Sequence, residues 1–564
     1  MAMANKEREK KFFFVGSLVN YAAELKLLLA TLFLLCGVAT LLQFLPSRFT
    51  ISSSDLRFCI SRVSLTPPPP STPPPPFTSL STPPTPLSST QKHLPNGTIK
   101  RVFNPHGSAA YNFITMGAYR GGLNTFAIVG LSSKPLHVYG KPTYVCEWIP
   151  DLPSLQNSSK PIITKGLKYL PDWGYGHVYT VVVVNCTFNG TAVNGDNTGG
   201  KLVLHASTSG AGDTGFNVTD RIEVLHEAPG ALNASLFMSK PKYDYFYCGS
   251  SLYGNLNPQR VREWIAYHVR FFGPKSHFVI HDAGGVHEEV LEVLKPWMEL
   301  GFVTLQDIRD QERFDGYYHN QFMVVNDCLH RYKFMAKWMF FFDVDEYIYV
   351  PPKTTIKSVL HSLSEYDQFT IEQMPMSSKI CLSEDYGKTY RILSGWTLFI
   401  SYEERDDRKL HYCGCMHLEL LAHPFSIHSV FPSDPGQLVL QHLGIMLYKG
   451  KWGFEKLVYR DSITGIRRDR KYAVQPRSLY ATGVHMSMDL SGKTTHKTEG
   501  RIKYFHYHGT ISERRETCKI LVNTTQVTQN KIPYVMDTTM RDTAGVIKKF
   551  ELKMIGTRLQ KTRQ

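Results

Sequence analysis

The C-terminal half of the chain alternates short apolar runs with longer segments whose apolar residues recur at helical spacing. Strand-like runs occupy 243–249, 277–282, 302–305 and 338–342, and helical patterns occupy 257–269, 286–300 and 320–333. Asn257 followed by Pro258 is typical of a helix start, with asparagine as the cap and proline in the first turn. Strands and helices that alternate in this rhythm predict an α/β domain built on a parallel sheet with helices on both faces.

Residues 102–237 show a different pattern, in which short strand-like runs alternate with clusters of glycine, asparagine and proline. The clearest runs are 178–184 and 201–205, and helical periodicity is poor. This pattern predicts an all-β sandwich. Its aromatic residues either stack on sugars or fill a core, and both roles stay open; they include Trp148, Trp173, Tyr175 and Tyr179. We therefore expect a carbohydrate-binding-like module.

The N-terminal region predicts a membrane anchor. Residues 27–47 carry no charged side chain and are mostly leucine, alanine, phenylalanine and valine, which is long enough to cross a bilayer. Basic residues in the preceding tail predict a cytosolic N-terminus and a single-pass type II topology, with everything after Arg48 in the lumen. A cleaved signal peptide fits less well, because the apolar run is long and starts late.

A proline-rich segment follows the predicted anchor, with eleven prolines between positions 67 and 86. Such a run cannot bury a core and adopts extended polyproline II structure, so it predicts a stem. The expected order is a cytosolic tail (1–26), the anchor (27–47), the stem (48–101), the β module (102–237) and the α/β domain (238–564).

Sequons and cysteines agree with a lumenal location. Asn-x-Ser/Thr sequons, the acceptors of N-glycosylation, occur only beyond the predicted anchor, at Asn96, Asn157, Asn185, Asn189, Asn217, Asn233 and Asn523. Of the 10 cysteines, eight follow the stem, where oxidising conditions permit disulfides. Their pairing cannot be deduced from spacing.

The formal net charge of +15 is spread along the chain, with a local basic cluster at 467–471. The cluster suits either a polyanionic substrate such as pectin or a solvated loop. Because no nucleic-acid-binding motif accompanies it, we do not expect nucleic acid as a partner.

Two carboxylates directly follow the most apolar strand. Asp343 and Asp345 come after Trp338–Phe342, where a buried strand ends. Ligands of open α/β sheets bind at that edge, and Mg²⁺ or Mn²⁺ is held there by one or two carboxylates and the phosphates of a substrate. The pair therefore predicts a metal site, although a bare Asp-x-Asp can also cap a helix.

The sequence around this motif resembles that of glycosyltransferase family 92. The resemblance rests on His319-Asn320-Gln321-Phe322, on Asn326 to Arg331 and on Phe342 to Ile348, and it covers roughly residues 100 to 540. With its stem, its β-rich module and residues 243–257, the chain further resembles the plant β-1,4-galactan synthase branch of that family. The resemblance implies a GT-A (Rossmann-like) fold. It also implies inverting transfer of galactose from UDP-galactose onto β-1,4-galactan side chains of pectin, with Mn²⁺, in the Golgi membrane, by a homodimer.

The same resemblance suggests roles for the metal site. Asp345 is expected to bind the metal, whereas Asp343 reaches the ribose or a metal-bound water, and Glu346 orients the ligands. Enzymes of this fold usually add a C-terminal histidine, for which His485 is our choice. His506 and His508 are the alternatives.

Inversion requires a carboxylate that takes the proton of the acceptor hydroxyl. Glu455 lies where such folds place this base, with alternatives at Glu404, Asp406, Asp407 and Asp434. An ion pair with a nearby basic residue is the competing role for Glu455. Donor contacts are expected at the strand ends from Ser250, Ser251 and Asp282, whose competing role is to form loop turns. Three basic residues can brace the diphosphate or else lie on a basic surface loop: Lys456, Arg460 and Lys471.

Two other functions remain open. One is a transferase of the same fold that uses another UDP-sugar. The other is a membrane-anchored glycan-binding protein without catalysis, against which the intact Asp343 and Asp345 argue.

Overall fold

The computed structural model describes residues 91–101, 104–106, 112–134, 142–151, 161–173, 178–190, 193–207, 219–310, 314, 318–385, 451–463, 470–487, 489–498, 500–515 and 517–561. Within these ranges, none of the helices is at once long and apolar enough to cross a bilayer. The predicted anchor at 27–47 and most of the predicted stem lie outside them.

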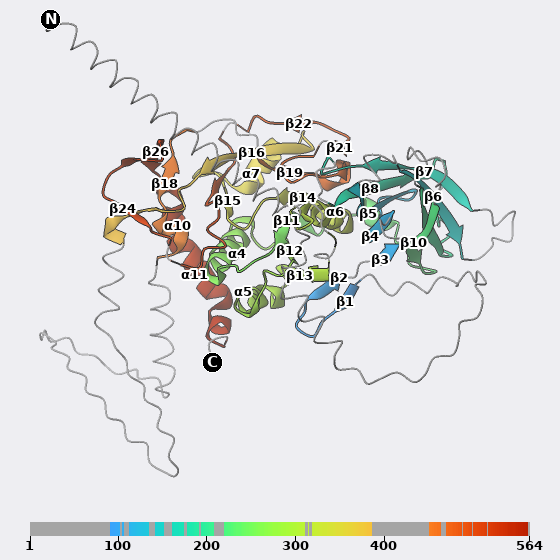
Figure 1. Ribbon diagram of the computed structural model, residues 1–564, viewed down its shortest axis with the longest axis horizontal. Helices are drawn as coiled ribbons and strands as arrows, with labels where there is room; N and C mark the ends of the chain where they lie inside the picture. The colour runs from blue at the N-terminus through green and yellow to red at the C-terminus, as the bar shows by residue number, and fades with distance from the viewer. Residues whose placement is uncertain are drawn as a thin grey trace, which may run out of the picture. The chain divides into compact units, whose positions relative to one another are not determined.

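A mixed sheet forms the body of the C-terminal domain (Figure 1). Its strand order is β1-β2-β13-β12-β11-β14-β19-β16-β23-β15, with β22 paired to β16. Its strands are β1 (Gln91–His93), β2 (Ile99–Arg101), β11 (Tyr243–Leu252), β12 (Ser276–Asp282), β13 (Val303–Asp307), β14 (Ala336–Phe341), β15 (Glu346–Tyr349), β16 (Gln368–Pro375), β19 (Lys471–Val474), β22 (Thr494–Thr495) and β23 (Lys503–His506).

The predicted parallel sheet is confirmed for the strands from β2 to β14, which pair in parallel. Beyond β14 the sheet becomes mixed, because β19 pairs antiparallel with both β14 and β16. The sequence did not predict this change, because the direction in which β19 pairs with β14 and β16 depends on contacts between residues that are distant in sequence.

Helices cover one face of the sheet, and a helix together with the β module covers the other. The helices are α3 (Ser235–Met238), α4 (Pro258–Phe272), α5 (Glu288–Glu299), α6 (Gln321–Tyr332), α7 (Ile356–Ser362), α10 (Gly453–Lys456) and α11 (Thr539–Lys561), with a 3₁₀ turn η3 (Pro476–Ser478). Alternate residues of β11 separate the two faces: Tyr245 and Tyr247 pack with α4, α5 and α11, whereas Phe246 and Cys248 pack with α6. The predicted cap is confirmed, because the Asn257 side chain accepts hydrogen bonds from the backbone N–H groups of Gln259 and Arg260.

The predicted all-β region is a single antiparallel sheet in the order β10-β9-β6-β7-β8-β5-β4-β3. Its strands are β3 (Asn104–His106), β4 (Phe113–Arg120), β5 (Thr125–Ser133), β6 (Thr143–Pro150), β7 (Ile162–Tyr169), β8 (Tyr179–Thr187), β9 (Gly200–Ser207) and β10 (Thr219–Glu227). The sheet curls so that its distant strands meet, since Arg120 of β4 pairs with Glu227 of β10 at 2.6 Å. We refer to these strands as the β module.

Smaller sheets complete the C-terminal part: β17 (Ile380–Leu382) with β24 (Ile520–Val522), β18 (Tyr459–Asp461) and β25 (Gln526–Gln529) on either side of β26 (Ile532–Met536), and β20 (Leu479–Ala481) with β21 (Asp489–Leu490).

The disulfides join elements that are distant in sequence. Cys146–Cys186 links β6 to β8, Cys248–Cys328 links β11 to α6, and Cys381–Cys518 spans 137 residues. Closing loops of this length restricts the unfolded chain and so stabilises the fold. The bonds also agree with the oxidising compartment expected from the sequence.

Candidate active site

Strand β14 carries the two acidic residues to the carboxyl edge of the main sheet. The strand ends at Phe341, and Asp343 and Asp345 lie in the turn before β15. The hydroxyl group of Tyr247 donates to the carbonyl of Phe342 at 2.9 Å and fixes the start of this turn. The predicted position of the motif, directly after a buried strand, is confirmed.

The carboxylate of Asp343 is engaged by the protein on both of its oxygens. Oδ1 accepts a hydrogen bond from Ser250 at the end of β11, and Oδ2 accepts one from Lys471 at 2.7 Å. Burial alone would raise the pKa of Asp343, but the ammonium group of Lys471 outweighs burial and lowers it to about 2. Asp343 is therefore an anion with its charge balanced inside the protein.

Glu346 braces the same turn from β15. Its Oε2 accepts the backbone N–H of Asp343 at 2.7 Å, and Lys471 lies 3.7 Å away. Burial raises the pKa of Glu346 to about 7. This geometry suits the orienting role expected for Glu346.

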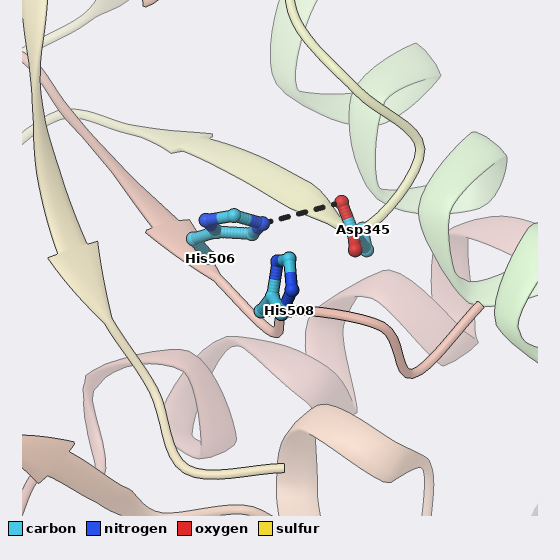
Figure 2. A group of neighbouring side chains, drawn as sticks. All are labelled: Asp345, His506 and His508. Atoms are coloured by element: carbon cyan, nitrogen blue, oxygen red, sulfur yellow. Dashed lines mark ion pairs between the residues drawn. The ribbon is translucent and has the colours of Figure 1, made fainter. Parts of the chain in front are cut away.

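Asp345 faces two histidines that come from the opposite end of the chain (Figure 2). Strand β23 pairs antiparallel with β15, which sets His506 opposite Glu346, and His508 follows in the next turn. His506 Nε2 lies 3.6 Å from Asp345 Oδ1, and Asp345 Oδ2 accepts the N–H of Gly509 at 3.0 Å. Burial would lower the pKa of His506, but the neighbouring carboxylates of Asp345 and Glu346 outweigh it, so the pKa is raised.

These three side chains suit a divalent cation. One ligand atom from each of Asp345, His506 and His508 lies within 4.8 Å of the others. A carboxylate suits magnesium and manganese, whereas imidazole favours transition metals, so this mixed set fits Mn²⁺ better than Mg²⁺. Three protein ligands leave further coordination positions for the oxygens of a substrate.

An aromatic pair borders the acidic turn. The Tyr253 ring stacks on His319 at 3.9 Å between centroids, and its hydroxyl donates to Tyr318 at 2.6 Å. Ser251 donates to the carbonyl of His319 at 2.9 Å. The predicted Ser250 and Ser251 thus lie at the site, the former on Asp343 and the latter on the segment that carries His319.

His485 does not join the group formed around Asp345. It lies in the connection between β20 and β21, whose Val484 packs against α6 and the β module. The two histidines considered as alternatives occupy the position instead, because β23, and not this connection, pairs with β15. Our choice of His485 is therefore replaced by His506 and His508.

Glu455 takes part in structural contacts. Its Oε2 accepts the N–H of Trp452 at the start of α10 and forms an ion pair with Lys548 of α11. The described contacts of its carboxylate thus hold two helices together, which is the competing role recognised in the sequence, and we withdraw Glu455 as the base. The alternative carboxylates, at 404, 406, 407 and 434, lie outside the described residues.

Of the remaining expected donor residues, Asp282 at the end of β12 and Lys471 at the start of β19 lie at the carboxyl edge of the main sheet. Asp282 caps the turn after β12 by accepting the N–H groups of Gly284 and Val286, at 2.9 and 3.0 Å. Lys456 ends α10, and Arg460 pairs with Asp537 at 3.1 Å. Lys471 is the basic residue that reaches the acidic turn, and it is buried rather than part of a surface loop.

The described sequons differ in accessibility. Asn96, Asn189, Asn233 and Asn523 are exposed. Asn185 is only 7% exposed, because it sits within β8 between β5 and β7. A buried strand residue cannot receive a glycan in the folded protein, so Asn185 is removed from the expected glycosylation sites. Asn157 and Asn217 lie outside the described residues.

Two contributors to the site carried little signal in the sequence. Gln373 of β16 lies 2.5 Å from His506 Nδ1, and Tyr253 forms the stack on His319. Both depend on the pairing of distant strands and turns, which leaves no local pattern. The one local signal is that Tyr253 is an aromatic residue directly after β11.

Comparison with known proteins gives consistent matches. The model of glycosyltransferase family 92 matches residues 243–563. Galactan beta-1,4-galactosyltransferase GALS3 of Arabidopsis thaliana is 55% identical over 573 residues, covering 100% of both chains. The GALS2 protein of the same plant is 54% identical over 99% of this chain and 100% of its own length. The GALS1 protein of the same plant is 48% identical over 82% of this chain and 80% of its own length.

Proposed function

The chain belongs to glycosyltransferase family 92, and we propose that it transfers galactose from UDP-galactose to the non-reducing end of β-1,4-galactan side chains of pectin. The observation that carries this proposal is the identity of 55% along the whole chain to a protein named for that activity. The acidic turn, with Asp345 beside two histidines, supplies the chemistry that a nucleotide-sugar donor requires. The fold proposed for the domain is GT-A.

The donor diphosphate is proposed to bind at Asp345, His506 and His508 together with Mn²⁺. When bound, the metal offsets the negative charge that builds up on the departing UDP. Lys471 keeps Asp343 ionised and immobile, so that the carboxylate can accept a hydrogen bond from a ribose hydroxyl or a metal-bound water. The stacked pair of Tyr253 and His319 offers a flat surface beside this turn for the nucleotide.

Inversion of the sugar needs a base on the acceptor side. Since the carboxylate of Glu455 is committed to Lys548 and the start of α10, the proposed candidates are Glu404, Asp406, Asp407 and Asp434. Replacing each by its amide in the full-length chain would identify the base as the residue whose loss lowers kcat most and leaves donor binding intact.

The β module is proposed to contact the glycan acceptor. The Trp173 side chain is 57% exposed, and Tyr169 of β7 stacks against the partly exposed Tyr480 at 5.7 Å. Exposed aromatic faces suit the apolar faces of galactose rings. By contrast, Trp148 and Tyr179 are buried in the core.

We further propose a single-pass type II protein of the Golgi membrane, with its catalytic domain lumenal, that acts as a homodimer. The sequons and the disulfides support the lumenal side. Protease protection of a tagged chain in sealed Golgi vesicles would test the topology, and cross-linking in those vesicles would test the dimer.

The activity is tested with the full-length chain purified in detergent. We expect elongation of a β-1,4-galacto-oligosaccharide when UDP-galactose and Mn²⁺ are supplied, and not with UDP-glucose or UDP-arabinose. Elongation with another UDP-sugar alone would favour the second transferase function. Glycan binding without elongation by any donor would favour the non-catalytic one.

A further inference from the structure

The β module is an insertion in the main sheet, and it is not a separate unit ahead of it. Strands β1 and β2 form a hairpin, and β2 pairs in parallel with β13 at the edge of the main sheet (Figure 1). The hairpin lies within the segment expected to be stem. The chain therefore enters the catalytic domain first, leaves it to form the module, and returns at β11.

A buried ion pair joins the hairpin to helix α6. Arg101 at the end of β2 and Asp327 of α6 are both fully buried, and the guanidinium group donates to the two carboxylate oxygens at 2.5 and 3.0 Å. Tyr119 of β4 also donates to Asp327, and Arg101 donates to the carbonyl of Met116 in β4 at 3.1 Å. One carboxylate on α6 thus holds both the hairpin and the module.

Helix α6 is clamped between the two sheets. Its Val325, Cys328 and Leu329 pack against the main sheet, and Cys328 is bonded to Cys248 of β11. Its Phe322 and Met323 pack against outward-facing residues of the module, which come from β4, β5 and β8: Ile114, Met116, Ala127, Val129, Leu131, Tyr179, Val181 and Val183. The module thus takes the place of the outer helix layer expected on this face.

The residues just before α6 are linked to the acidic turn through hydrogen bonds of β11. Tyr318, His319 and Asn320 all adopt left-handed backbone conformations, with φ between 49° and 54°. Non-glycine residues keep such conformations only where the surroundings hold them. Here the restraints are the start of α6 and the bond from Ser251 to His319, one residue from the Ser250 that binds Asp343.

We propose that Asp327 is a positioning residue for the donor site: paired with Arg101 and Tyr119, it fixes α6 on the module and so sets His319 and Tyr253 beside Asp343. This inference rests on the proposed function, because it treats the His319 side of the turn as the place where the nucleotide binds. The module then has a role in the donor site as well as any role with the acceptor.

The test compares Asp327→Asn with Glu227→Gln in the full-length chain. Glu227 is the matched control, because it also pairs with an arginine in the module but belongs to β10, away from α6. Two readouts are measured on folded protein: the Kd of UDP with Mn²⁺ by calorimetry, and hydrogen exchange of the backbone over residues 318–324. We expect Asp327→Asn to raise the Kd at least about fivefold, the lower end of typical coupling between sites, and to speed exchange. Glu227→Gln should change neither readout.

Unchanged exchange and unchanged UDP affinity in folded Asp327→Asn would overturn the inference, as would equal effects of both variants. If Asp327→Asn does not fold, Tyr119→Phe removes one bond to the same carboxylate and should shift both readouts in the same direction by less. If the wild-type chain binds no UDP, the proposed donor is wrong, while the exchange readout still decides whether Asp327 positions the segment that carries His319.

Discussion

Two of the regions that hold buried charges, the junction of the β module with α6 and the acidic turn, differ in how those charges are balanced. At the junction of the β module and α6, Asp327 faces both Arg101 and Arg331. At the acidic turn, the three carboxylates of Asp343, Asp345 and Glu346 face Lys471 and a histidine. The first region has two guanidinium groups for one carboxylate, whereas the second has three carboxylates for one permanently charged cation, Lys471.

This difference separates a structural ion pair from a binding site. Burial would raise the pKa of Asp327, but Arg101 and Arg331 outweigh it and hold the pKa well below its usual range. Glu346 is not neutralised to the same extent, and its pKa rises to about 7. An excess of carboxylates beside two histidines is the arrangement that a divalent cation completes.

Removing the carboxylate of Asp345 tests the acidic turn and has the largest expected effect. Asp345→Ala should lower kcat by about 10²–10³-fold, because a group that stabilises developing charge is lost. Chelation of divalent metal in the wild-type enzyme should abolish turnover as well. Asp244→Asn, at a half-exposed position on β11, serves as the control and should keep its rate. Equal rates for both variants would show that the acidic turn is not the catalytic centre.

Breaking the ion pair between Arg101 and Asp327 should destabilise the fold. Asp327→Asn leaves Arg101 buried without its counterion, which costs about 3–5 kcal/mol of unfolding free energy. Replacing both partners by apolar residues, as in Arg101→Met with Asp327→Leu, should cost less, since the fully buried guanidinium group of Arg101 is removed together with its counterion. Denaturant unfolding measures both values. A double variant that is less stable than the single one would contradict this account of the junction.

Four histidines show a third arrangement, burial without charge. Burial lowers the pKa of His268 and His330 to about 3 and of His277 and His281 to about 4. These values lie below the ordinary pKa of about 6.5. The stability that the neutral, buried imidazoles contribute to the fold is therefore fully present above pH 6.5, and it is lost as the pH falls toward their lowered pKa values.

Unfolding free energy should therefore fall by about 2 kcal/mol for each such histidine between pH 7 and pH 5. Denaturant unfolding at both pH values measures this loss. His268→Gln should reduce the pH dependence by one histidine's share. A pH dependence that His268→Gln leaves unchanged would show that the imidazole of His268 is already protonated or solvated.

Glu455 is a carboxylate in structural contacts, and its replacement can be compared directly with that of Asp345 in the acidic turn. Glu455→Gln should leave kcat within about twofold and lower stability by about 1 kcal/mol, since it weakens the pair with Lys548 and the start of α10. Steady-state kinetics and thermal unfolding would measure the two effects. A loss of kcat comparable to that of Asp345→Ala would restore Glu455 as the base.

The smallest effect concerns glycosylation, which reports on the β module alone. Peptide mapping of the full-length protein should find a glycan at Asn189, which is exposed, and none at Asn185. Asn185→Gln should then leave the apparent mass on a gel unchanged. A glycan at Asn185 would mean that β8 is not paired on both sides in the mature protein.

Local signals predicted much of this fold. The cap at Asn257, the apolar run before Asp343 and the strand around Val181 each depend on neighbouring residues, and each is confirmed. The partners of Asp345 could not be chosen in the same way. They depend on the register that sets β23 against β15 across more than 150 residues, and His485 has the same local character as His506.

The hairpin at the start of the described chain is a second case. Arg101 follows a proline-rich run, and its partner Asp327 lies 226 residues further on, so nothing near it in the sequence predicts a buried residue. Lys471 belongs to a basic stretch that suggests a surface loop, yet it is buried against Asp343. In both cases the environment of the charge is set by tertiary pairing.

The most direct test of the central claim is a crystal structure of the protein with UDP and Mn²⁺, with the metal located by anomalous scattering. We expect the manganese peak between Asp345, His506 and His508 at about 2.0–2.3 Å from their ligand atoms, with the diphosphate completing its coordination. A peak coordinated by Asp343 and His485, or no peak at the acidic turn, would contradict the account.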